Sequence, residues 1–257
     1  MNYGLYVAAA GAVDASYRQA VLTNNLVNSE TVGFKPDIVF GRQRSPERLG
    51  AGSSGAGIDP QLMLERLGGT PTLSPGGLDL SQGALEATGN PLDLALNGEG
   101  FFVVQTGDGQ LRLTRDGRFT MDDNGQLVMA GNGMAVLDSR NRPIRLDRDQ
   151  EVSISSRGDV EQLGKVVATI RITQPTDPTD LVKVGGNLLR SDSLPAPSPR
   201  ATAGRVMQGF IEKSAVDAVT LLKDIVGAAK SFGGNIKMMQ YMDYIMGQAI
   251  NTFGRVT

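Results

Sequence analysis

The two ends of the chain carry helical patterns, whereas the middle carries a pattern of strands and turns. Near the N-terminus, small and apolar side chains recur in steps of three and four, with Gln19 as the one polar member: Leu5, Ala8, Ala12, Ala15, Leu22 and Leu26. This spacing places side chains on one stripe of a helix. The pattern predicts a helix over residues 5–28 that ends near the turn glycine Gly33.

The C-terminal end repeats this pattern over a longer stretch. Its stripe consists of Ala218, Leu222, Ile225, Ala229, Phe232, Ile236, Met239, Met246, Ile250 and Phe253, with Asp243 as the polar interruption. The pattern predicts a helix of roughly 40 residues, about 60 Å long. Ser214 is its predicted N-cap, with Asp217 at the third helical position.

Glycines interrupt the predicted C-terminal helix, among them Gly227, Gly233 and Gly234. Each costs up to ~1 kcal/mol relative to alanine. They indicate close helix packing, a bend, or a break at Gly233-Gly234. Because a sustained apolar stripe is typical of a coiled-coil seam, we expect the terminal helices to pack on each other, on other chains, or on both.

Between the helices, short apolar segments alternate with turn signals. Strands are predicted at residues 92–96, 101–104, 111–114, 118–121, 127–129, 152–154, 166–173 and 181–184. Turn pairs such as Asp108-Gly109 and Asn124-Gly125 supply the positive φ angles that tight hairpins need. The pattern therefore predicts a small, antiparallel, all-β region.

The sequence thus predicts an α+β protein with a discontinuous α-helical coiled-coil domain from both termini and a central all-β antiparallel domain. The terminal helical assembly domain is expected over residues 1–35 and 205–257, and the β-rich outer domain over residues 80–204. Residues 41–77 collect Gly, Ser and Pro with little periodicity, so we expect an extended linker over residues 36–79.

Composition removes several classes of chemistry. Histidine and cysteine are absent, so zinc, haem and iron–sulfur sites lose their usual ligands, and His- or Cys-based nucleophile arrangements are excluded. A net charge of −2 gives no global basic field to attract nucleic acid. No apolar run approaches the ~20 residues of a membrane-spanning helix, and the N-terminal apolar stretch lacks the basic flank of a secretory signal.

The candidate chemical motifs favour structural interpretations. Gly98-Glu99-Gly100 lacks the third glycine of a dinucleotide loop, and Asp122-Asp123-Asn124-Gly125 lacks the spacing of a calcium loop. The carboxylates of Glu99, Asp108 and Asp116 fall at turn positions, where acidic residues are common. The sequence therefore predicts no catalytic residue, no cofactor and no metal site. A carbohydrate-acting enzyme with a carboxylate pair stays open as an alternative.

Motifs along nearly the whole chain resemble those of one family. Asn24–Asn28, followed by Thr31, Gly33, Phe34 and Lys35, resembles the N-terminal signature of bacterial flagellar rod and hook proteins. Further matching segments, in order, are Ser81–Leu85, Thr88–Leu96, Gly98–Phe102, the hairpin Thr114–Phe119, and Gly209–Asp217 at the opening of the C-terminal helix. The chain departs from the family at Ala215, where asparagine is usual, and at Leu222-Lys223, where Glu-Met is usual.

The resemblance implies a non-enzymatic, structural subunit of the flagellar basal-body rod. Such subunits polymerise into a hollow helical axial tube that transmits torque and carries the export channel. The implied partners are copies of the chain, other rod and hook axial proteins, and the flagellar type III export apparatus. The implied location is the periplasmic rod, reached without a cleaved signal peptide. Length and the Gly11-Ala12 opening are most similar to the proximal rod protein; distal rod and hook subunits are the alternatives.

The assembly interface is expected on the two helical stripes and on three amides at the end of the first helix. Capping accounts for one or two of these amides, and the resemblance favours contacts with a neighbouring subunit for the remainder. The expected interface residues are Leu5, Ala8, Ala12, Ala15, Leu22, Asn24, Asn25, Leu26, Asn28, Leu222, Ile225, Ala229, Phe232, Ile236, Met239, Met246, Ile250 and Phe253.

Overall fold

The computed structural model describes residues 2–43, 71–74, 77–195 and 204–253. Close contacts divide the chain into two units, which are described separately. The helical unit comprises residues 1–26, 37–77 and 217–257, and the β unit comprises residues 27–36 and 78–216. The predicted α+β class, with a helix at each end and antiparallel strands between them, is confirmed.

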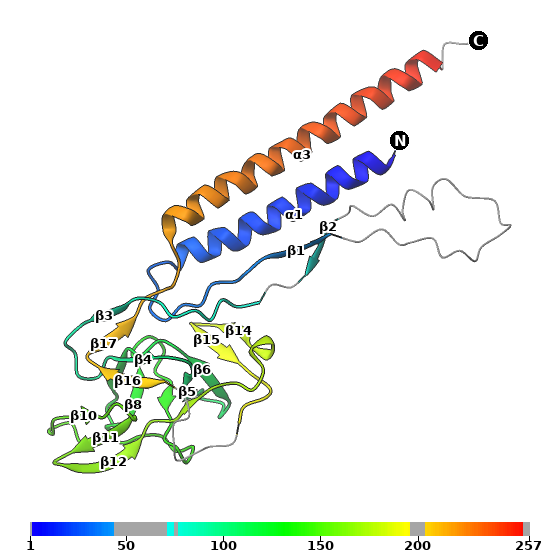
Figure 1. Ribbon diagram of the computed structural model, residues 1–257. Coiled ribbons are helices and arrows are strands. Elements are labelled where there is room, and N and C mark those ends of the chain that lie inside the picture. The colour runs from blue at the N-terminus through cyan, green and yellow to red at the C-terminus, as the bar shows by residue number, and fades with distance from the viewer. Residues whose placement is uncertain (1, 44–70, 75–76, 196–203, 254–257) are drawn as a thin grey trace. The chain divides into compact units, whose positions relative to one another are not determined.

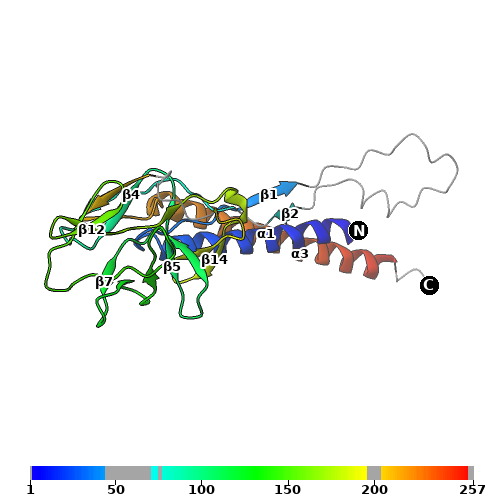
Figure 2. The same cartoon turned by 90° about the horizontal axis from the view of Figure 1, so that it is seen from below.

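In the helical unit, α1 (Asn2–Val27) and α3 (Ala218–Phe253) lie side by side and antiparallel (Figures 1 and 2). A β-carbon added at Gly4 would lie 3.1 Å from the Met242 side chain, and one at Gly11 would lie 2.9 Å from that of Asn235. The helices therefore approach closely where α1 carries glycine. Within the span expected to be a linker, β1 (Phe40–Gln43) pairs with β2 (Pro71–Ser74); its residues 44–70 and 75–76 lie outside the described part.

Side chains of the predicted α1 stripe are among the least exposed of that helix. Ala8, Ala12 and Ala15 are 4–5% exposed. The longer members of the stripe are half-buried, namely Leu5, Gln19, Leu22 and Leu26. The small alanines thus occupy the centre of the packed face.

In α3 the packed stripe is offset from the predicted one. Buried or half-buried side chains occur at Leu221, Ala228, Asn235, Met242 and Ala249. Each of these residues comes one position before a member of the predicted stripe. Among those predicted members, Leu222, Ala229 and Ile250 are exposed and Ile236 is half-buried.

The remaining members of the predicted stripe are partly covered. The half-buried ones are Ala218, Ile225, Met239 and Met246, and Phe232 is 38% exposed; the side chain of Phe253 lies outside the described part. Apolar residues occur both at the packed positions and one residue later, so periodicity alone does not decide which of the two stripes packs on α1.

The start of α3 also differs from the prediction. Asp217, not Ser214, is the cap: its Oδ1 accepts a hydrogen bond from the Val219 N–H at 3.0 Å, and its Oδ2 accepts one from the Thr220 hydroxyl at 2.6 Å. The Thr220 hydroxyl and the Val219 N–H lower the pKa of Asp217. Ser214 lies in the extended segment before the helix, which then continues unbroken through all its glycines.

The β unit is built from short antiparallel strands. These are β3 (Leu85–Ala87), β4 (Leu94–Asn97), β5 (Phe101–Gln105), β6 (Leu111–Thr114), β7 (Phe119–Met121), β8 (Leu127–Met129), β9 (Ala135–Val136), β10 (Ser153–Ile154), β11 (Asp159–Gln162), β12 (Lys165–Thr169), β13 (Ile172–Thr173), β14 (Val182–Gly185), β15 (Leu188–Arg190), β16 (Arg205–Gln208) and β17 (Phe210–Glu212), with the 3-10 turn η1 (Pro178–Asp180). The predicted strand at 166–173 is divided, because β12 pairs with β11 whereas β13 pairs with β5.

The largest sheet has the order β14-β15-β6-β5-β9-β8-β7, with β13 also on β5. The apolar run of β5 is buried on both faces. Phe102 and Val104 belong to the larger core cluster, and Phe101 and Val103 to a smaller one. Phe102 meets Phe119 edge-on, with ring centroids 5.2 Å apart. Two further pairs, β16 with β4 and β17 with β3, join the C-terminal end of the β unit to its start.

The predicted turns form around β5–β6 and β7–β8. Gly109 and Gly125 adopt φ angles of 82° and 72°. Asp122 accepts hydrogen bonds from the N–H groups of Asn124 and Gln126, both at 2.8 Å. The Asp122 carboxylate therefore closes a hairpin turn, as predicted.

Candidate functional site

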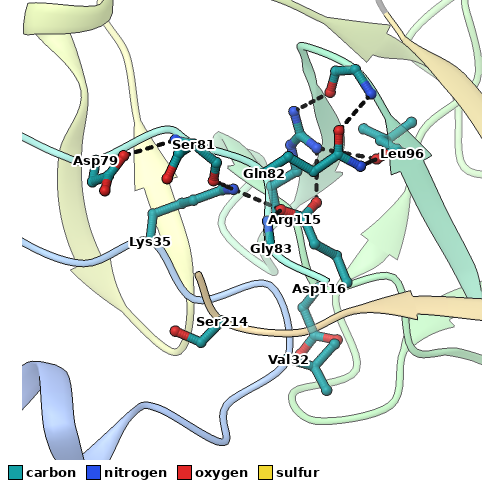
Figure 3. Close-up of polar contacts among 12 residues, drawn as sticks. Val32, Lys35, Asp79, Ser81, Gln82, Gly83, Leu96, Arg115, Asp116 and Ser214 are labelled. Carbon is teal, nitrogen blue, oxygen red and sulfur yellow. Dashed lines mark hydrogen bonds and ion pairs between the residues drawn. The ribbon is translucent and has the colours of Figure 1, made fainter. Parts of the chain in front are cut away.

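A buried carboxylate lies where the motif segments of the β unit meet; Figure 3 shows the residues Lys35, Gly83 and Arg115 that surround it. Glu212, the last residue of β17, is 1% exposed. Its Oε1 accepts hydrogen bonds from Lys35 Nζ at 2.7 Å and from the Gly83 N–H at 3.1 Å. Its Oε2 accepts one from Arg115 Nη1 at 2.8 Å. We call these four residues the Glu212 clasp.

Backbone geometry positions the clasp. Pairing of Glu212 with Leu85 brings the carboxylate beside Gly83. The Gly33 N–H donates to the Glu212 carbonyl at 2.7 Å. Gly33 has a φ of +68°, and an added β-carbon would lie 2.4 Å from the Arg115 backbone. Because glycine alone tolerates both the angle and the approach, it allows the segment carrying Lys35 to enter here.

A second layer of contacts holds the clasp side chains in place. Lys35 Nζ donates to the Ser81 carbonyl at 2.7 Å, and Arg115 Nη2 donates to the Gly98 carbonyl at 2.7 Å (Figure 3). The Arg115 guanidinium lies 5.3 Å from the centroid of the Phe101 ring. Gln82 joins the same backbone through the Leu96 carbonyl at 3.0 Å and the Gly98 N–H at 3.0 Å.

The clasp contains two buried cations and one buried anion. Burial lowers the pKa of Lys35, and the hydrogen bond to Glu212 acts in the opposite direction. Arg115 Nε is buried and has no hydrogen-bond partner among the described residues. The Glu212 charge is therefore what compensates the desolvation of Lys35 and Arg115. Because the ionic groups are engaged with one another, the arrangement suits mechanical joining rather than reaction.

The clasp lies next to the places where the chain passes between units. The β unit includes residues 27–36 and 78–216, so Lys35 precedes one passage, Ser81 and Gly83 follow another, and Glu212 precedes the passage to α3. One carboxylate thus joins both terminal segments of the β unit to its interior. Sequence reasoning placed Lys35, Arg115 and Glu212 inside motifs but gave them no role. The signal that could have found them is that each is a charged residue within an otherwise apolar or glycine-rich segment, where a buried charge needs a partner.

The three predicted interface amides have different environments. Asn25 is 4% exposed; its Nδ2 donates to the Asp37 carbonyl at 2.9 Å, and its Oδ1 accepts from the Asp37 N–H at 3.0 Å. Asn28 Oδ1 accepts from the Thr31 hydroxyl at 3.2 Å, and Asn24 is exposed. The Asn25 amide is thus used within the helical unit, where it ties α1 to the returning chain.

Replacing Asn25 with alanine is expected to lower the free energy of unfolding of the chain by about 1–3 kcal/mol, because two backbone groups of Asp37 lose their partner. Urea unfolding followed by far-UV circular dichroism measures this loss. Ser16→Ala, at an exposed position of the same helix, is the control and should change stability by less than about 0.5 kcal/mol. Equal effects of the two substitutions would contradict the role assigned to Asn25.

Each of the candidate catalytic carboxylates has a hydrogen-bond partner of its own. Glu99 accepts from the Gln174 amide, Asp108 from the Thr106 hydroxyl, and Asp116 from Arg118 at 2.7 Å. Among the described residues, no three His, Cys, Asp or Glu side chains are grouped as metal ligands would be. In the same part of the chain, no helix has the length and apolar character needed to cross a membrane.

Comparison with known proteins identifies the family. Residues 5–35 match the family described as "Flagella basal body rod protein", and residues 95–162 match "Flagellar hook protein FlgE/F/G D1 domain". The chain is 30% identical to the flagellar basal-body rod protein FlgF of Caulobacter vibrioides, with 100% of both chains covered. It is 29% identical to FlgF of Escherichia coli, covering 97% of each, and 32% identical to FlgG of Bacillus subtilis, covering 98% of this chain and 99% of the relative. The chain therefore belongs to the flagellar basal-body rod proteins and is a structural subunit of the rod.

Proposed function

We propose that this rod subunit polymerises through its terminal helices into a hollow helical tube that carries the export channel and transmits motor torque. In this proposal α1 and α3 form a coiled-coil layer around the channel, and the β unit forms the outer part. The partners are further copies of the chain and other rod and hook proteins. The chain acts as a structural element and has no catalytic site.

The observation that carries the proposal is the apolar surface left on both helices. Tyr6, Val13 and Val27 of α1 are 61%, 59% and 75% exposed, and Val219 and Ile250 of α3 are 77% and 73% exposed. Isolated exposed apolar residues are common, but such series along two packed helices mark an interaction surface. Contacts of this kind that do not close on themselves generate helical filaments.

The Glu212 clasp supports the mechanical part of the proposal. Covalent segments of the chain join the two units and can carry torque between them. At the β-unit ends of these segments, Glu212 forms buried ion pairs with Lys35 and Arg115 and accepts a hydrogen bond from the Gly83 N–H. Breaking one partner of such a pair is strongly unfavourable, which gives the ends a fixed attachment.

Further parts of the proposal concern how the subunit is exported and where in the rod it lies. The subunit would be delivered by the flagellar export apparatus without a cleaved signal peptide and would act in the periplasmic section of the rod. Its placement as the proximal rod subunit stays a prediction, since relatives named FlgF and FlgG both match over the full chain. Labelling the protein in purified basal bodies against known rod segments tests the placement.

The assembly proposal is tested by charge placed on the exposed apolar surface of α1. Val13→Glu adds a carboxylate at a position that is 59% exposed within the chain, and Ser231→Glu adds the same charge at an exposed polar position of α3. In cells lacking the native protein, Val13→Glu should abolish swimming and be missing from purified basal bodies, whereas Ser231→Glu should retain both. Absence of the unmodified chain from basal bodies, or normal swimming with Val13→Glu, would refute the proposal.

A further inference from the structure

α3 carries a second apolar stripe beside the one that packs on α1. Its members again follow steps of three and four: Val219, Leu222, Val226, Ala229, Gly233, Ile236, Gln240, Asp243, Gly247 and Ile250. We call this series the outer stripe. Its large apolar members include Val219, Leu222 and Val226, which are 77%, 52% and 52% exposed. Among the described residues of one chain, these three side chains have little to cover them.

Gly233 of the outer stripe has no structural explanation among the described residues. A β-carbon added there would meet no described atom within 4 Å. A glycine nevertheless costs about 1 kcal/mol relative to alanine in a helix. On α1 the opposite holds, because Gly4 and Gly11 face Met242 and Asn235 at close range. Glycine thus occurs where α1 and α3 approach closely inside the chain, and also on the outer stripe of α3, where no described side chain packs against Gly233.

The exposed face of α1 has the complementary shape. Opposite its packed alanines, side chains recur in steps of three and four, with one polar member at Asn24: Tyr6, Ala10, Val13, Tyr17, Ala20 and Val27. This face is uncharged and carries large side chains where the outer stripe carries small ones. If it meets the outer stripe in the antiparallel register that Gly4–Met242 and Gly11–Asn235 define within the chain, Val13 falls opposite Gly233 and Tyr17 opposite Ala229.

Charges beside the two faces are also complementary. Asp14 adjoins the exposed face of α1; its Oδ1 is buried without a hydrogen-bond partner among the described residues, and Arg18 lies 4.0 Å from its other oxygen. Lys223, Lys230 and Lys237 are exposed on α3 and repeat every seven residues beside the outer stripe. A helix seated there would bring a lysine towards Asp14.

We propose that the outer stripe of α3 binds the exposed face of α1 from a second copy of the chain. Each α3 then lies between two α1 helices, its own and a neighbour's, and the new contact continues the existing one around the helix. This inference rests on the proposed assembly function and names the partner surface within it. The proposed contact also gives a reason why apolar residues of α3 occur both on the stripe that packs on α1 and on the outer stripe beside it.

Disulfide cross-linking tests the contact directly, since the chain has no cysteine of its own. Gly233→Cys is combined in turn with Ala10→Cys, Val13→Cys and Tyr17→Cys, and purified basal bodies are oxidised and analysed on non-reducing gels. Disulfide-linked dimers are expected, most strongly with Val13→Cys. The matched control, Ser231→Cys with Val13→Cys, moves the thiol off the stripe and should give none. The pair Gly11→Cys with Asn235→Cys should link within one chain.

The outcomes separate this inference from the proposed function. Basal bodies that contain the chain but give no dimer, or give equal dimers with the Ser231→Cys control, overturn the inference alone. Basal bodies without the unmodified chain overturn the proposed function. Should the cysteine variants fail to assemble, Ala229→Glu decides: it should prevent incorporation while the urea midpoint of the isolated chain is unchanged. Normal incorporation of Ala229→Glu would overturn the inference.

Discussion

Replacing Glu212 with alanine is expected to lower the free energy of unfolding of the β unit by about 3–5 kcal/mol, the usual cost of removing one partner of a buried ion pair. The substitution leaves Lys35 and Arg115, which are 3% and 5% exposed, without an anion. It also removes the acceptor of the Gly83 N–H. Urea unfolding of the purified chain, followed by the β-sheet signal in circular dichroism, measures the loss.

A second ion-paired glutamate provides the control. Glu86 contacts Lys213 at 2.7 Å, as close as Glu212 to Lys35, but the Glu86 side chain is 51% exposed. Water already solvates the charges of both Glu86 and Lys213, so Glu86→Ala should lower the free energy of unfolding by no more than about 1 kcal/mol. Similar losses for Glu86→Ala and Glu212→Ala would show that burial does not give the clasp its importance.

Gly83→Ala is expected to be similarly damaging, for a steric reason. A β-carbon at Gly83 would lie 1.8 Å from the Lys213 carbonyl oxygen and 2.8 Å from its carbon. Both atoms belong to backbone next to Glu212, so relief of the clash must separate β17 from β3. We expect a loss of about 3 kcal/mol or more in the free energy of unfolding, measured by urea titration.

Gly107→Ala is the matched comparison for Gly83→Ala. An added β-carbon at Gly107 meets no atom of the described residues within 4 Å, and the residue lies in an exposed turn between β5 and β6. Its substitution should change stability by less than about 0.5 kcal/mol. A Gly83→Ala protein as stable as the Gly107→Ala protein would show that the approach of Lys213 can relax without cost.

Local patterns predicted the elements of this fold well because their causes are local. The apolar run of β5 and the turn glycines Gly109 and Gly125 each predict a structure from adjacent residues. The offset of α3 could not be predicted in this way. Leu221 and Leu222 are both apolar, and only the approach of α1 decides which of them is buried.

The clasp could not be predicted from spacing because its members are far apart in the sequence. Lys35 and Glu212 are separated by 177 positions, and no periodicity connects them. The motifs that carried the family resemblance did contain Lys35, Gly83, Arg115 and Glu212. The structure gives these motifs a common physical reason, since each contributes one group to the same buried site.

The clasp also constrains the order in which the chain can fold. A chain that is synthesised N-terminus first contains Lys35 early, yet its partner Glu212 follows 177 positions later. β3 must likewise wait for β17, and β4 for β16. Contacts of such long sequence separation form slowly, because loop closure must precede them. A chain that lacks its last strands therefore cannot complete the clasp, and β3 and β4 stay without these partners until β16 and β17 are present.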